Sequence, residues 1–177
     1  MPPFDWKESY SVGHAAMDQQ HRQIFTIANA LYDAIRQAGG APKQYLRDVI
    51  TTLSDYTRSH FAAEEQLQLE IDYPGYERHK QLHDALIKRV EELDARLRNG
   101  YAGIAAQILS LLVREWMSRH IYIEDQRYAG YVAAQTDCAC CAQLVSGAAH
   151  AWRQDKVDLA SAWMRPAHDR NKAATAP

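Results

Sequence analysis

Seven side chains that can bind metal ions lie in segments whose apolar spacing predicts a helical core. They are five histidines and two carboxylates: His21, His60, Glu64, His79, His83, His120 and Asp125. The first six fall on apolar stripes, so we expect them to be buried. One buried histidine would indicate only an imidazole bonded to a neighbour. Several buried polar groups would together cost more than the stability of about 5–15 kcal/mol that a domain has, so a metal centre is the obvious compensation.

The spacing of these residues places them on helix faces that can converge. His60 and Glu64 are four residues apart, as are His79 and His83, so each pair projects from one face of its helix. Asp125 lies about 140° around an ideal helix from His120, so it is the least well placed of the seven. A local distortion of the helix or the reach of the carboxylate must bring it in.

Seven protein ligands are too many for one tetrahedral zinc ion. Two six-coordinate ions that share bridging carboxylates would accommodate them. Imidazole and carboxylate together suit iron, and the cores of helix bundles can hold di-iron sites. Manganese and zinc remain alternatives at this point.

Four long amphipathic segments between residues 14 and 130 carry these ligands. Gly39-Gly40, Pro74-Gly75 and Asn99-Gly100 separate the segments, and apolar residues recur within them at intervals of three and four. Short connections favour antiparallel neighbours. The sequence therefore predicts an all-α fold, an up-down-up-down antiparallel four-helix bundle over residues 1–130 in which residues 1–13 form an irregular N-terminal arm.

Residues 131–177 form a predicted C-terminal extension. Cys138, Cys140 and Cys141 make a CxCC cluster, which we interpret either as a soft-metal or redox site or as a loop with three reduced thiols. An amphipathic pattern from about Ala142 to Pro166 predicts a fifth helix, which could cover a face of the bundle or mediate dimerisation.

The bulk composition excludes several classes of function. The formal net charge of the 177 residues is −2, so no basic surface points to nucleic acid. No apolar run approaches the roughly 20 residues that span a bilayer, and the N-terminus lacks the pattern of a signal peptide. We expect a cytoplasmic protein, either a monomer or a weak homo-oligomer.

The chain resembles bacterial hemerythrins in five stretches. These are Trp6 in the arm, DQQH at 18–21, HFAAEE at 60–65, YPGYERHKQLH at 73–83 and WMSRHIYIEDQRY at 116–128. All seven ligand positions of the family are filled in order. The resemblance implies that His79, His83 and His120 hold one iron and that His21 and His60 hold the other. Glu64 and Asp125 would bridge the two ions, together with an oxo or hydroxo group.

The resemblance also implies a function. The iron with two histidines would keep a position open for dioxygen, so the protein would bind oxygen reversibly as a carrier, store or delivery protein and not as an enzyme. An oxygen-consuming enzyme is a candidate partner. The alternatives are an oxygen or redox sensor that acts through the C-terminal extension, and di-iron catalysis on peroxide or nitric oxide.

Some positions depart from the family or carry little information. Family members commonly have methionine at Gln68 and phenylalanine at Leu86, so oxygen affinity and autoxidation rate are the properties that these two differences put in question. We interpret Trp6, Trp116 and Tyr128 mainly as packing residues, with Tyr128 also a candidate hydrogen-bond donor near Asp125. Five residues are predicted to form an apolar shell around the site: Ile24, Phe25, Leu67, Leu86 and Leu112. We expect His14 and His168 to be solvated.

Overall fold

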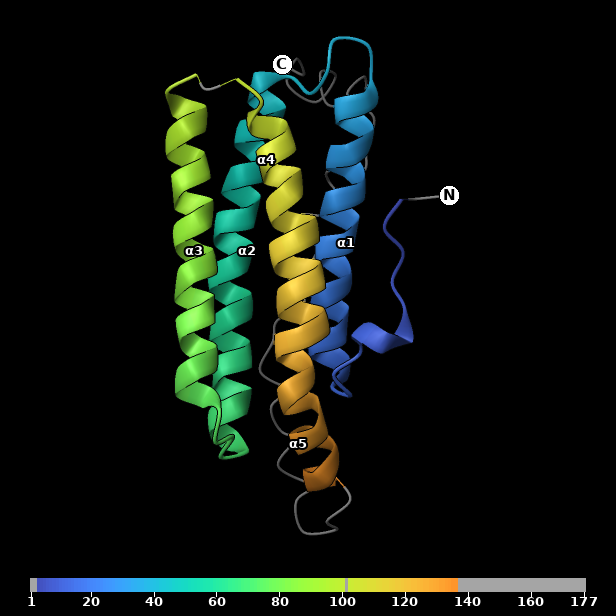
Figure 1. Ribbon diagram of the computed structural model, residues 1–177, viewed down its shortest axis with the longest axis vertical. Coiled ribbons are helices and arrows are strands. Elements are labelled where there is room, and N and C mark those ends of the chain that lie inside the picture. The colour runs from blue at the N-terminus through green and yellow to red at the C-terminus, as the bar shows by residue number, and fades with distance from the viewer. Residues whose placement is uncertain (1–2, 101, 137–177) are drawn as a thin grey trace, which may run out of the picture.

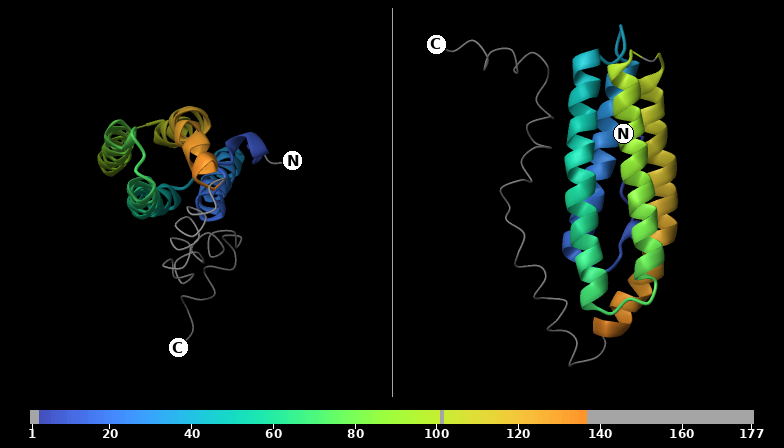
Figure 2. Two further views of the ribbon diagram at one scale, coloured as in Figure 1. Left: turned by 90° about the horizontal axis from the view of Figure 1, so that it is seen from below. Right: turned by 90° about the vertical axis from the view of Figure 1, so that its left-hand side faces the viewer.

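The protein folds into four long antiparallel helices, as a computed structural model that describes residues 3–100 and 102–136 shows. The first three are α1 (Ala15–Arg36), α2 (Lys43–Glu70) and α3 (Tyr76–Arg98). The fourth consists of three consecutive segments: α4 (Ile104–Ser110), the π-helical segment η2 (Leu111–Asp125) and α5 (Gln126–Thr136). The helices run alternately up and down (Figure 1) around one axis (Figure 2). The predicted all-α, up-down-up-down bundle is confirmed.

The predicted turn residues separate the helices. Gly39 and Gly40 both have positive φ angles between α1 and α2, and Pro42 is the residue that precedes the first turn of α2. In the turn between α2 and α3, a Cβ atom on Gly75 would lie 2.7 Å from atoms of the Tyr73 ring, so glycine lets the chain pass close to this side chain. Both connections keep consecutive helices adjacent and antiparallel.

Two apolar clusters fill the interior. The larger contains residues of all four helices, among them Leu31, Leu53 and Ile108, which are completely buried. The smaller cluster consists of Val12, Met17, Leu67, Ile71 and Tyr128, near the turn between α2 and α3. On α2, His60 and Glu64 lie between Leu53 and Leu67, so the polar ligands occupy the zone between the two clusters.

The N-terminal arm is anchored to the bundle by specific contacts. The backbone N–H of Phe4 donates to the Asn29 side chain, which in turn donates to the Phe4 carbonyl. Asp18 accepts hydrogen bonds from the backbone N–H of Val12 at 2.8 Å and from the Ser11 hydroxyl at 2.6 Å. The arm contains one short 3₁₀ turn, η1 (Glu8–Tyr10), which packs near η2 through Tyr10 and Tyr122. These contacts hold the arm along the side of the bundle, beside α1 and η2 (Figure 1).

The burial of His14 and the extent of the fourth helix differ from the sequence predictions. His14 is buried rather than solvated, because its Nδ1 atom accepts a hydrogen bond from the Met17 N–H and caps α1. The fourth helix continues past Gly130 and includes Thr136, the last residue that the structure describes. The cysteine cluster, the predicted fifth helix and His168 lie outside the described residues, and the division at residue 130 stays a prediction.

Within the described part of the chain, no helix is long and apolar enough to cross a membrane.

The larger cluster should determine the stability of the bundle. We expect Leu53→Ala to reduce the free energy of unfolding by about 2–5 kcal/mol, because Leu53 is completely buried and its truncation leaves a cavity. Leu69→Ala on the same helix is the control, since Leu69 is 50% exposed. Urea denaturation at equal metal loading would measure both variants, and equal losses would contradict this description of the core.

Candidate metal centre

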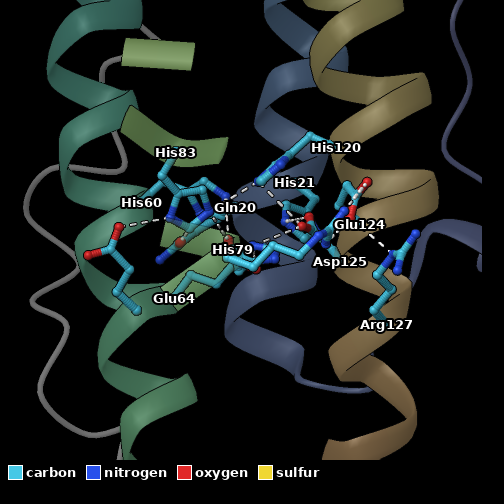
Figure 3. A network of polar contacts seen from close by, with 12 residues as sticks. Gln20, His21, His60, Glu64, His79, His83, His120, Glu124, Asp125 and Arg127 are labelled. Carbon is cyan, nitrogen blue, oxygen red and sulfur yellow. Dashed lines mark hydrogen bonds and ion pairs between the residues drawn. The ribbon is translucent and has the colours of Figure 1, made fainter. Parts of the chain in front are cut away.

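The seven predicted residues meet in the middle of the bundle (Figure 3). His21 comes from α1, His60 and Glu64 from α2, His79 and His83 from α3, and His120 and Asp125 from η2. Each of the seven is at most 2% exposed. The structure therefore brings together every residue that the sequence analysis selected and separates all of them from solvent.

The histidines form two groups. The ring centroids of His79, His83 and His120 lie 4.6–5.0 Å from one another, and the Nε2 atoms of His83 and His120 are 3.1 Å apart. The rings of His21 and His60 form a second group with centroids 5.0 Å apart. Candidate ligand atoms of Glu64, His79, His83 and His120 lie within 4.8 Å of one another, as do those of His21, His60 and Glu64. The geometry thus offers two adjacent sites that share Glu64.

Both carboxylates contact histidines of both groups. Glu64 oxygens lie 3.6 Å from the Nε2 atom of His60, 3.5 Å from that of His79 and 3.4 Å from that of His83. Asp125 oxygens lie 3.3 Å from His21, 3.4 Å from His79 and 3.3 Å from His120. These separations exceed the usual 2.9–3.0 Å of an N–H···O hydrogen bond. Separations of this size suit donor atoms that surround a shared metal ion.

The π-helical segment explains how Asp125 reaches the site. In an α-helix, residues five apart point in different directions, whereas the i→i+5 hydrogen bonds of a π-helix place them one turn apart on the same face. His120 and Asp125 both lie in η2, and the Ser118 hydroxyl donates to the carbonyl of Val113, five residues earlier. The local distortion that the sequence analysis required is therefore a change of helix type.

Hydrogen bonds to the outer ring nitrogens orient two of the histidines. The Nδ1 atom of His60 lies 2.7 Å from the Gln20 side-chain oxygen, and that of His83 lies 2.9 Å from a Glu65 oxygen. If these nitrogens donate, the Nε2 atoms are free to bind a metal. The Gln20 carbonyl also accepts a hydrogen bond from the Tyr56 hydroxyl, so Gln20 links α1 to α2 twice.

The sequence analysis did not identify Gln20 or Glu65. Gln20 directly precedes His21, and Glu65 directly follows Glu64, so both lie within the stretches that resemble the family. The spacing of apolar residues gave no reason to select them, because a contact from a neighbouring helix depends on how the helices are rotated in the assembled bundle.

Burial and charge set the protonation of the site. Burial lowers the pKa of His21 and His120, and it lowers the pKa of His60 to about 3. These three imidazoles are therefore neutral, which is the state that binds metal ions. Burial opposes the charged form of His83, but the adjacent Glu64 and Glu65 carboxylates outweigh it and raise its pKa to about 9.

The pKa values of the two carboxylates shift in opposite directions. Burial and the nearby charge of Glu64 raise the pKa of Asp125. Burial also acts to raise the pKa of Glu64, but the adjacent His79 and His83 imidazoles outweigh it and lower the pKa. A cation between the two would allow both carboxylates to ionise.

The protein's own side chains leave the site incompletely satisfied. Eight buried ligand atoms have no hydrogen-bond partner among the described residues: both ring nitrogens of His21, the Nε2 atoms of His60 and His79, and all four carboxylate oxygens of Glu64 and Asp125. Such a concentration of unpartnered atoms is expensive in a folded core. Metal ions that bind imidazole and carboxylate fit this donor set, so the residues present suit the metal centre that the sequence predicts.

An ion-pair cluster supports the Asp125 end of the site. The Arg78 guanidinium holds Glu124 through two hydrogen bonds of 2.7 and 3.1 Å, and the Arg127 Nε atom lies 3.0 Å from the same carboxylate. Hydrogen bonds to Arg78 lower the pKa of Glu124. Because Glu124 and Arg78 are the neighbours of Asp125 and His79, this pairing fixes the end of η2 against the start of α3.

Aromatic rings and aliphatic side chains enclose the centre. The Phe61 ring stacks on His83 with centroids 3.8 Å apart, and it contacts the completely buried Trp116. Tyr56 stacks on His60. The five predicted shell residues, Ile24, Phe25, Leu67, Leu86 and Leu112, are all buried. Tyr128 is also buried and lies edge-on to His79, with ring centroids 5.8 Å apart.

The fold and the buried His/Glu cluster define a four-helix bundle with a candidate metal centre. The family model described as "Hemerythrin HHE cation binding domain" matches residues 12–132. The chain belongs to the hemerythrin family, which confirms the resemblance seen in the sequence.

Individual relatives agree with this assignment. A bacteriohemerythrin of Stenotrophomonas maltophilia is 38% identical over 129 residues, which cover 73% of this chain and 81% of that protein. A hemerythrin-like protein of Naegleria gruberi is 31% identical over 128 residues, which cover 72% and 92% of the two chains. The crystal structure of a hemerythrin mutant has a TM-score of 0.65 and 25% identity, and the match covers 75% of this chain and 99% of that one.

The contact between Gln20 and His60 should matter for metal affinity. We expect Gln20→Leu to weaken binding at the His21–His60 site by about 10–100-fold, since it removes the group that orients the His60 ring. Gln19→Leu is the matched control, because Gln19 is the adjacent residue and is exposed. Competition with a chelator would measure both variants. Equal affinities for the two would show that Gln20 does not orient the ring.

Proposed function

We propose that this chain binds dioxygen reversibly at a non-haem di-iron centre and acts as an oxygen carrier, store or delivery protein. The observation that carries the proposal is that Glu64 and Asp125 each contact histidines of both groups. In this assignment His79, His83 and His120 hold one iron, and His21 and His60 hold the other. Glu64, Asp125 and a solvent-derived oxo or hydroxo group lie between the ions.

The composition of the ligand set favours reversible binding over oxidation. Di-iron bundles of the ferritin-like class use glutamate-rich sets with Glu-x-x-His motifs, and such anionic ligands stabilise high-valent iron. Here five of the seven proposed ligands are imidazoles, which favour the ferrous state. When bound, the two ferrous ions would supply the electrons for reversible oxygen binding. We therefore propose a binding protein and not an enzyme.

The surroundings of the site support the same proposal. The His21–His60 group has one histidine fewer than the other group, which leaves more room for an external ligand. Phe61, Trp116 and the buried aliphatic side chains keep bulk water from the ligand atoms. Restricting water and protons favours the release of oxygen unchanged. The oxygen-consuming partner, the cytoplasmic location and the state of assembly stay predictions from the sequence.

The test is an optical spectrum of the anaerobically reduced protein before and after air, with iron quantified in the same sample. We expect two irons per chain and visible charge-transfer bands that appear in oxygen and vanish when oxygen is removed. Bands that cannot be reversed by deoxygenation would contradict reversible binding and favour the sensor or catalytic alternatives.

Removal of a proposed bridge should abolish this behaviour. We expect Glu64→Ala to lose at least one of the two irons and the reversible bands, because Glu64 is the ligand common to both groups. Glu70→Ala is the control, since Glu70 is exposed on the same helix. Full iron content and unchanged bands in Glu64→Ala would rule out Glu64 as a bridge.

A further inference from the structure

Gln68 is a buried polar residue that the proposed metal centre does not use. It lies one helical turn after Glu64 on α2 and is completely buried. Neither its Nε2 nor its Oε1 atom has a hydrogen-bond partner among the described residues. Burying an amide without hydrogen-bond partners costs free energy, so we expect the Gln68 amide to bind a partner such as water.

A surface pocket of about 290 Å³ lies beside Gln68 at the turn between α2 and α3. Gln68 forms part of its wall, and Asp72, Tyr73 and Glu77 line it as well. Because Gln68 is inaccessible to solvent, the pocket is closed at the amide in this conformation. No hydrogen bond to a described residue holds the side chain in place, so a small rotation could open the path.

Two contacts connect the pocket to the proposed ligands. Along α2, Gln68 and Glu64 are separated by one turn. Across the bundle, the Tyr73 ring in the pocket wall contacts the Tyr128 ring with centroids 6.1 Å apart, and Tyr128 contacts the His79 ring at 5.8 Å. The Tyr128 hydroxyl is also buried without a partner among the described residues. The pocket wall is thus linked to Glu64 along α2 and to His79 through the Tyr73 and Tyr128 rings.

The charge of the pocket wall determines which small molecules can enter the pocket. Asp72 and Glu77 place two carboxylates in the wall, and neither the wall nor Gln68 contributes a positive charge. Small anions are therefore disfavoured, whereas water can bond to an amide and a hydroxyl.

We propose that the pocket at the α2–α3 turn is the water access of the metal centre and that Gln68 is its inner gate, where the amide binds the incoming water. The inference rests on the proposed function, because the gate acts at the proposed di-iron centre. Release of oxygen as hydrogen peroxide takes two electrons from two ferrous ions and two protons from solvent. Water at Gln68 would bring those protons close to the centre and limit the lifetime of the oxygenated protein.

The first test is a crystal structure of the protein at high resolution, which does not depend on oxygen binding. We expect an ordered water within hydrogen-bond distance of the Gln68 amide, and we expect its absence in Gln68→Met, a variant of similar length that lacks the amide. A dry Gln68 in the wild-type protein would overturn the proposal.

The second test is the autoxidation rate of the iron-loaded protein in air. We expect Gln68→Met to autoxidise more slowly by at least about threefold, because the gate no longer binds water. Gln66→Met is the matched control, since Gln66 is exposed on the same helix. Equal rates for Gln68→Met and the control in a protein that binds oxygen reversibly would overturn the gate alone. A wild-type protein without reversible bands would instead count against the proposed function, while the water at Gln68 could still be observed.

Discussion

The burial of two carboxylates and five imidazoles in one bundle is the constraint on which the rest of the structure depends. The side chains alone leave eight buried ligand atoms without hydrogen-bond partners. Burial, together with the nearby charge of Glu64, also raises the pKa of Asp125. An arrangement of this kind is stable only with a compensating positive charge, and the positions of the histidines show where that charge would lie.

Several features of the fold serve this constraint. Apolar clusters on either side of the ligands hold the four helices in register, and the arm packs along α1 and η2. The π-helical segment brings Asp125 onto the face of His120. Gln20 and Glu65 orient two rings, while Arg78 and Arg127 hold Glu124 beside Asp125. The same enclosure explains why water would need a specific path, which Gln68 could provide.

Sequence reasoning reached the fold and the residues of the site because their signals are local. Helical periodicity and turn residues predicted the bundle, and polar residues on apolar stripes predicted six of the seven side chains that meet, all except Asp125. The π-helix could only be anticipated as an unspecified distortion near Asp125, since it depends on packing along the whole fourth helix. The contacts of Gln20 and Glu65 and the capping role of His14 depend on neighbouring segments, and no periodicity within one helix reports them.

The most direct test of the account is a crystal structure of the iron-loaded protein with anomalous data collected at the iron absorption edge. The account predicts two anomalous peaks, one among His79, His83 and His120 and one beside His21 and His60, with Glu64 and Asp125 between them. A single peak, or none in crystals grown with iron, would contradict the central claim that this ligand set holds a pair of ions.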